Sequence, residues 1–346
     1  MSSNTPTQSN VPEKPYILIS GASRGIGLSL VTALLEHRPH AVIFAGARDP
    51  SAAKELAEVA KKNPNVHVVP LIADDEASVK RAVEEVGKVT KKLDIVIANA
   101  GINSPFVPTH VDDIDLFKTN FSVNTLGPVY LYQATYPLLV ESRKKDSATS
   151  TSPPKFFITS SAVASMGAYH TMFMNASYGV SKAGANYLAL SIHHQTGDVD
   201  AVHPGLVSTD MGKISGKELG IPDNYPGVLT PDQSAAEYAD LIIKSTRAEH
   251  GGKFWAQGVE GATQERIHSP SRLSTDALSE EPLPSATVCT LRAHICSQDP
   301  SLFLSAGAAD VDGDKSYARF DDPDRPVILD DCGRREVFRS VAGQRK

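Results

Sequence analysis

The stretch SGASRGIG, at residues 20–27, decides the fold of this chain. It lies between a short apolar run, Tyr16–Ser20, and a segment with helical periodicity, Gly25–His37. Its three glycines allow a tight turn, close approach of the backbone to a pyrophosphate, and close packing of the helix on the strand. A glycine-rich stretch alone also fits an ordinary strand-to-helix turn. Its position between a strand and a helix favours a dinucleotide-binding site.

Short apolar runs alternate with helical segments through residues 15–261. Runs of this kind are typical of strands that are buried on both faces, with the helices connecting parallel strands. The sequence therefore predicts an α/β fold, a doubly wound parallel sheet of the Rossmann type in a single domain. The expected strands are 16–20, 41–46, 66–72, 94–98, 156–160, a run ending at 203, and 253–257; the expected helices are 25–37, 51–62, 76–91, 111–141, a segment from about 177, and 230–246.

Prolines mark the boundaries of two helical segments. Pro128 and Pro137 are expected to interrupt the long region at 111–141, because proline removes a backbone hydrogen bond. The sequence TPDQ, at 230–233, predicts a helix that begins with a threonine cap followed by proline at the first helical position.

The two ends of the chain lack the strand–helix alternation. Residues 1–14 form a polar leader, and residues 262–346 contain turn formers and scattered charge without sustained periodicity. We expect the second segment to be an irregular or disordered tail. Its run Asp310–Asp314 has glycine at the fourth position, whereas a calcium loop needs it at the sixth, so no metal site is predicted.

Composition argues against several kinds of partner. A formal net charge of −6 and a pI near 6.0 give no reason to expect nucleic acid or an anionic membrane. No run of about 18 apolar residues is present, and the leader lacks the apolar stretch of a secretory signal. All three cysteines lie after residue 288, which is typical of a reducing compartment and indicates the cytoplasm. Whether the chain forms a homo-oligomer is left open.

The end of the second expected strand distinguishes between the nicotinamide dinucleotides. An acidic residue there would bind a free ribose hydroxyl and repel a 2′-phosphate. The strand ends in Ala47-Arg48, and Arg48 can pair with a phosphate, assisted by Arg24 from the glycine turn. The alternatives are that Arg48 is a solvated surface residue and that the neighbouring Asp49 is the missing acid. We favour NADP (NADPH) over NAD.

A tyrosine and a lysine four residues apart, Tyr178 and Lys182, share one face of an expected helix. A nearby ammonium favours the phenolate, so Lys182 is expected to lower the pKa of Tyr178. Such a pair alone also fits an unremarkable surface helix. Parallel strands end at one edge of a sheet, which brings Ser160 and Asn99 toward the pair, and Asn124 follows in the next helical region.

These motifs, in this order, resemble the short-chain dehydrogenase/reductase family: SGASRGIG, NAG at 99–101, a helical asparagine, a strand-end serine and YxxxK. The segments YGVSKAGANY and HPGLVSTDMG, at 178–187 and 203–212, are especially similar to fungal ketoreductases of the norsolorinic acid ketoreductase kind. The resemblance covers about residues 15–261. It implies an NADPH-dependent reductase whose substrate is a bulky apolar or aromatic carbonyl compound, such as a polyketide ketone.

The resemblance also implies roles for matching positions. Tyr178 would give a proton to the carbonyl oxygen, and Lys182 would hold the nicotinamide ribose. Ser160 would polarise the carbonyl, with Ser161 as the alternative register, and Asn124 would kink its helix and hold a water. The residues implied to contact the cofactor are Gly21, Ser23, Arg24, Gly25, Ile26, Gly27, Arg48, Asp74, Asn99, Tyr178, Lys182, Val207 and Thr209.

Three features depart from the family pattern. The family's third strand ends in an Asp-Val pair that contacts adenine, whereas here Asp74 can serve only with a shifted register. The strand at 198–203 is unusually polar and follows Lys182 closely, and the tail replaces the family's usual ending. These departures leave a non-catalytic NADP-binding homologue as one alternative. Epimerisation or dehydration on the same fold is another.

The segment between Ser160 and Tyr178 contains apolar residues that could form the wall of a substrate pocket. Packing in a core or an interface explains them equally well. The glycine- and proline-interrupted stretch Gly212–Gly227 could be a mobile lid over the substrate. The apolar residues are Ala162, Val163, Met166, Tyr169, Met172, Phe173 and Met174.

Overall fold

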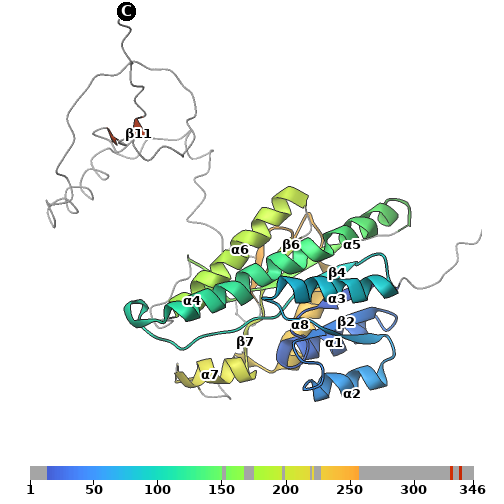
Figure 1. Cartoon of the computed structure of the whole chain (residues 1–346), viewed down its shortest axis with the longest axis horizontal. Helices are drawn as coiled ribbons and strands as arrows, with labels where there is room; N and C mark the ends of the chain where they lie inside the picture. Colours follow the sequence, from blue (N-terminus) through green and yellow to red (C-terminus); the bar gives the residue numbers. More distant parts are fainter. Residues whose placement is uncertain are drawn as a thin grey trace, which may run out of the picture. The chain divides into compact units, whose positions relative to one another are not determined.

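A computed structural model describes most of the predicted domain (Figure 1). The chain divides into two compact units, Met1–Arg272 and Leu273–Lys346. The predicted leader, apart from Lys14, and most of the predicted tail lie outside the described residues. The second unit contributes only β10 (Ile328–Leu329) and β11 (Arg335–Glu336), which pair antiparallel. The described residues are 14–149, 153–166, 175–196, 199–218, 220–221, 227–256, 328–329 and 335–336.

The predicted doubly wound parallel sheet is confirmed. Seven parallel strands have the order β3-β2-β1-β4-β5-β6-β9, so the chain winds outward from β1 in one direction and then from β4 in the other. This reversal creates a crevice at the carboxyl ends of β1 and β4, where ligands bind in such sheets. The strands are β1 (Tyr16–Ile19), β2 (Val42–Ala47), β3 (Val66–Pro70), β4 (Ile95–Ala98), β5 (Lys155–Thr159), β6 (Val199–His203) and β9 (Phe254–Ala256).

Helices cover both faces of the sheet, with α1, α2 and α8 on one face and α3, α5 and α6 on the other (Figure 1). Alternate residues of β1 show why: Ile17 and Ile19 pack in the first core cluster, and Leu18 packs in the second. The helices are α1 (Gly25–His37), α2 (Lys54–Lys62), α3 (Glu76–Val89), α4 (Ile114–Phe121), α5 (Gly127–Thr149), α6 (Ala176–Thr196), α7 (Asp210–Glu218) and α8 (Pro231–Lys244). None of the helices in the described ranges is both long and apolar enough to cross a membrane.

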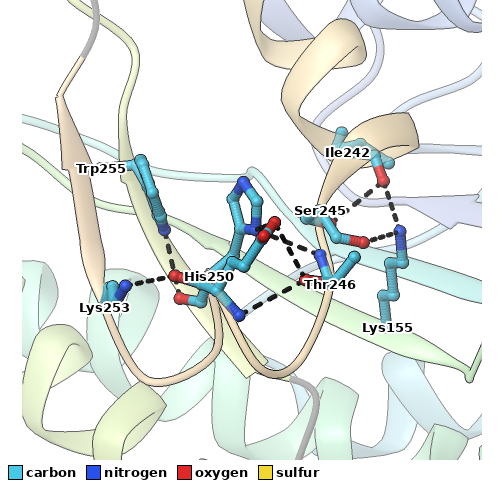
Figure 2. A network of polar contacts seen from close by, with 8 residues as sticks. Lys155, Ile242, Ser245, Thr246, His250, Lys253 and Trp255 are labelled. Atoms are coloured by element: carbon cyan, nitrogen blue, oxygen red, sulfur yellow. Dashed lines mark hydrogen bonds and ion pairs between the residues drawn. The ribbon is translucent and has the colours of Figure 1, made fainter. Parts of the chain in front are cut away.

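The ends of α8 follow from local chemistry. The predicted cap is confirmed, since Thr230 and Gln233 form a reciprocal capping box around Pro231. At the other end, Lys155 of β5 is 8% exposed and its Nζ donates to the carbonyl oxygens of Ile242 (2.8 Å) and Ser245 (2.7 Å) (Figure 2). A cation at a helix C-terminus is favoured by the helix dipole. This buried lysine therefore fastens α8 to the amino end of β5.

Two details differ from the expected pattern. The long helical region is interrupted at Ser122–Leu126 by one turn of π-helix, whereas the expected break at Pro137 is wrong because this proline lies inside α5. The polar run near residue 200 does form a strand. Its members Ala201 and Val202 are buried, and β6 pairs with β5 on one side and β9 on the other.

Candidate active site

The glycine turn after β1 is built for close backbone approach. Gly21 and Gly25 have positive φ angles of 68° and 55°, a region that favours glycine. A Cβ at Gly27 would overlap the carbonyl oxygen of Gly21. The Asn99 amide donates to the carbonyl oxygens of Ser20 and Gly21, both at 3.2 Å, and thereby fixes the turn to the end of β4.

Helix α1 begins at this turn without a side-chain cap. Arg24 occupies the cap position, and its side chain makes no capping hydrogen bond. The first N–H groups of the helix therefore receive no hydrogen bond from the cap side chain, which leaves them available to a pyrophosphate. Ser23 is half-buried beside them, while the half-buried Ile26 packs against the core. The turn thus fits the diphosphate of a dinucleotide.

The segment after β6 forms the facing wall. Val207 is buried in β7 (Leu206–Val207), which pairs with β8 (Val228–Leu229). A Cβ on Gly25 would lie 3.1 Å from Cγ2 of Thr209, so Thr209 borders the glycine turn. Arg24 Nη1 forms a 2.7 Å ion pair with Asp210, the first residue of α7. Arg24, which the sequence assigned to phosphate, is therefore engaged by α7 in this structure.

The ends of β2 and β3 carry the charged residues that the sequence singled out. Arg48 is exposed directly after β2. The carboxylate of Asp49 accepts from Oγ (2.6 Å) and N (2.9 Å) of Ser51, and these bonds lower its pKa. Asp74 is exposed after β3, and its neighbour Asp75 caps α3 by accepting from Ser78 N at 3.0 Å.

Tyr178 and Lys182 lie on α6 beside the carboxyl end of β5. Lys182 is 4% exposed, and its Nζ donates to the carbonyl oxygen of Thr159 at 2.7 Å. The same Nζ lies 5.8 Å from the centre of the Tyr178 ring. The side chain of Ser161 lies near enough to the Tyr178 hydroxyl to lower the pKa of that phenol. The structure thus brings a phenol, an ammonium and a hydroxyl together.

Burial dominates the electrostatics of this pair. It lowers the pKa of Lys182 from 10.5 to about 8, because the ammonium has lost its hydration. It also raises the pKa of Tyr178, and the side chain of Ser161 offsets part of that rise. The expectation that Lys182 lowers the pKa of Tyr178 below its ordinary value is therefore wrong for the chain by itself.

The two adjacent serines have different partners. Ser160, which the sequence placed on the substrate carbonyl, is 3% exposed and its Oγ donates to Oδ1 of Asn186 at 2.5 Å. Ser161, the alternative register, is the residue beside Tyr178. It also begins a short 3₁₀ turn, Ala162–Ala164, by accepting from Val163 N at 3.3 Å. The side chain of Ser160 thus meets Asn186 of α6, and that of Ser161 lies beside the phenol.

Asn124 lies at the centre of the π-helical turn and is 1% exposed. Its Oδ1 accepts from Ile102 N, and its Nδ2 donates to Ile102 O and to Ser181 Oγ, each at 2.9 Å. A Cβ on Gly101 would lie 3.1 Å from Asn124 Oδ1 and 3.2 Å from Lys182 Nζ. Asn124 therefore fixes the loop after β4 against the lysine.

One residue of the site was missed. Asn175 precedes α6, and its Oδ1 accepts from Tyr178 N at 3.1 Å, so it caps the helix that carries the tyrosine. Its Nδ2 donates to Asn103 Oδ1 at 2.7 Å, and Asn103 in turn donates to Ser215 of α7 at 2.9 Å. The signal was available in the sequence, since asparagine is a preferred helix cap.

The predicted substrate wall is only partly described. Ala162 and Val163 are half-buried, and Met166 is 86% exposed. The remaining wall residues Tyr169, Met172, Phe173 and Met174, and residues 219 and 222–226 of the predicted lid, lie outside the described residues. The first part of that lid is helix α7.

Known proteins resemble the chain over this domain. A family model described as short chain dehydrogenase matches residues 15–219. An uncharacterised oxidoreductase of Schizosaccharomyces pombe is 34% identical over 247 residues, which is 68% of this chain and 93% of the relative. The norsolorinic acid ketoreductase of Aspergillus parasiticus is 30% identical over 257 residues, 72% of this chain and 91% of the relative.

Two solved structures are also similar to the chain over this domain. An NADPH-bound carbonyl reductase from chicken fatty liver superposes with a TM-score of 0.61 at 28% identity, covering 70% of this chain and 96% of its own. The carbonyl reductase Sniffer of Drosophila melanogaster has a TM-score of 0.63 at 25% identity, covering 70% and 97%.

Proposed function

Because the chain belongs to the short-chain dehydrogenase family, we propose that it is an NADPH-dependent reductase of a bulky apolar or aromatic ketone. One observation carries the proposal. Lys182 Nζ lies 5.8 Å from the centre of the Tyr178 ring and Ser161 lies beside the same phenol, at the sheet edge where the glycine turn also opens. A proton donor, an orienting hydroxyl and a dinucleotide site thus share one crevice.

The protonation states suit a reduction. Bound NADPH would supply the hydride. Burial raises the pKa of Tyr178, so the phenol is protonated at neutral pH, as a proton donor to the substrate oxygen must be. Ser161 would hydrogen-bond that oxygen and then the phenolate that remains. With a pKa of about 8, Lys182 is largely charged at pH 7 and stabilises the phenolate.

The remaining residues would hold the cofactor and the proton path. Lys182 would bind the nicotinamide ribose, and Val207 and Thr209 would contact the nicotinamide end. Asn99 would hold the glycine turn, and Asn124 would keep the water that restores the proton of Tyr178. Asp74 would contact the adenine half of the cofactor, because it follows β3.

NADPH is preferred to NADH because of the charges after β2. Arg48 is exposed at the position where a 2′-phosphate would lie, and a guanidinium binds phosphate well. The competing acid, Asp49, is engaged by Ser51 at 2.6 Å and so is drawn toward its own turn. Arg24 could join Arg48 only after leaving Asp210. The charge pattern thus supports a phosphorylated ribose.

A bulky apolar substrate is supported by exposed apolar side chains on two segments that follow β5 and β7. Met166 follows Ser161 by five residues, and α7 carries Met211 (36% exposed) and Ile214 (63% exposed). The ketoreductase among the relatives suggests a polyketide-like ketone. We place this activity in the cytoplasm, on small molecules and not on nucleic acid, in line with the acidic charge and the late cysteines.

NADPH oxidation with a panel of aromatic ketones tests the proposal. We expect turnover by the full chain, and loss of turnover in Tyr178→Phe with NADPH binding retained. Tyr187→Phe is the matched control, since Tyr187 lies on the same helix with 75% of its surface exposed. Turnover that survives in Tyr178→Phe would exclude the proposed acid. NADPH binding without any turnover would favour the non-catalytic alternative.

A further inference from the structure

We propose that Asn186 is a positioning residue that acts through Ser160 to hold β5 in register with α6, and so places Ser161 against Tyr178. The inference rests on the proposed function. It concerns a residue outside the tyrosine–lysine motif, whose side chain forms no hydrogen bond with Tyr178 or Lys182 among the described residues.

Asn186 continues the row that begins with Tyr178 and Lys182. Residues four apart on a helix lie on one face, so positions 178, 182 and 186 face the same neighbour. That neighbour is the end of β5, and the row contacts three consecutive residues there. Lys182 binds the Thr159 carbonyl and Asn186 binds the Ser160 hydroxyl, while Tyr178 lies beside Ser161, which lowers the pKa of the phenol.

The Ser160 contact is suited to fixing a register. Ser160 is 3% exposed, its backbone N donates to Val202 O at 2.7 Å, and its Oγ reaches Asn186 Oδ1 at 2.5 Å. The residue is therefore tied to β6 by its backbone and to α6 by its side chain. A buried hydroxyl that lost this acceptor would need another partner, and the strand end would have to move to supply one.

Ser161 depends on that anchor because little else holds it. It has extended backbone, with φ −153° and ψ 149°, and among the described residues its side chain accepts one hydrogen bond, from Val163 N in the short turn that follows. Adjacent side chains of extended backbone point in different directions. Fixing Ser160 on Asn186 therefore leaves Ser161 to face Tyr178. If the end of β5 shifted by one residue along α6, Ser160 would face Tyr178 in place of Ser161.

The experiment is a double-mutant cycle in the full chain. Ketone turnover and NADPH affinity are measured for the wild type, Asn186→Ala, Ser160→Ala and the double variant, with Ser161→Ala alongside. We expect each single change at 186 or 160 to lower kcat by about 10- to 100-fold with the KM for NADPH unchanged, since small misplacements of reacting groups cost that much. We expect the double variant to be no worse than either single variant. Ser161→Ala should lose at least as much.

Two further variants separate positioning from folding. Asn186→Asp keeps the Oδ1 acceptor and should restore most of the turnover that Asn186→Ala loses. Gln195→Ala is the matched control, because Gln195 is an exposed amide on α6 whose side chain donates to Ser191 Oγ one turn away, at 3.0 Å; its turnover should equal that of the wild type. If Asn186→Ala keeps wild-type kcat, or if the losses at 186 and 160 multiply, the inference is wrong while the proposed function stands. A wild type without turnover refutes the proposed function itself.

Discussion

Replacing Lys182 by methionine is expected to stabilise the fold while removing the proposed catalysis. Lys182 is 4% exposed, and burial lowers its pKa from 10.5 to about 8. The folded chain thus binds this proton less tightly than the unfolded chain does. Between pH 8 and 10.5 the unfolded state carries the extra proton, so stability rises with pH across that window. Below pH 8 the full cost of the buried charge is present.

The pKa difference sets the magnitude. A change from 10.5 to about 8, at about 1.4 kcal/mol per pH unit, corresponds to about 3 kcal/mol of destabilisation at pH 7. Methionine has similar length and no charge, so it removes this cost. It also removes the bond from Nζ to the Thr159 carbonyl, which offsets about 1 kcal/mol. We expect a net gain of about 2 kcal/mol, or a rise in Tm of about 4–8 °C for a domain of this size.

Thermal and urea unfolding of the wild type and Lys182→Met, followed by circular dichroism, measures this gain. At pH 7 the variant should be the more stable protein, and the difference should shrink steadily from pH 8 to pH 10. Lys61→Met is the control, because Lys61 is an exposed lysine of α2 and should show no such dependence on pH. A variant that is less stable at pH 7, or a gain that does not change with pH, would refute the buried-charge reasoning.

Three other changes test the cofactor site and the domain boundary. Gly27→Ala should abolish NADPH binding and cost about 1–3 kcal/mol in urea unfolding, because the new Cβ overlaps the Gly21 carbonyl; normal binding would contradict this geometry. Arg48→Ala should raise the Kd for NADPH about 10-fold or more with little effect on NADH, and equal losses would remove its phosphate role. Deletion of residues 273–346 should leave a folded unit that binds NADPH, since residues up to 272 form a compact unit; an aggregated product would show that the tail is needed.

The sequence was sufficient for the sheet and the glycine turn. Strands buried on both faces are short apolar runs, and each βα unit begins and ends at such a run. In the structure, Ile17 and Ile19 lie in one core cluster and Leu18 lies in the other, as expected for a strand that is buried on both faces. Glycines at positive φ are equally easy to recognise in the sequence, because other residues rarely adopt that conformation.

Features that depend on tertiary contacts could not be predicted in the same way. Proline disfavours helix interiors in general, yet Pro137 lies inside α5. The π-helical turn around Asn124 also has no periodic signature, since it adds one residue to an otherwise helical pattern. The effect of a lysine on the pKa of a neighbouring tyrosine depends on how far both groups are buried. The spacing of Tyr178 and Lys182 in the sequence does not indicate that burial.

The serine register shows the same dependence at the site itself. Ser160 and Ser161 are chemically identical and adjacent, so no property of either residue identifies the partner of Tyr178. Their surroundings differ: the Ser160 hydroxyl donates to Asn186 Oδ1 at 2.5 Å, whereas Ser161 lies beside the phenol. The proposed chemistry would thus require two alignments, the helix row at 178, 182 and 186 and the end of β5. A motif search that matches only the tyrosine and the lysine tests the first of these alignments and leaves the second untested.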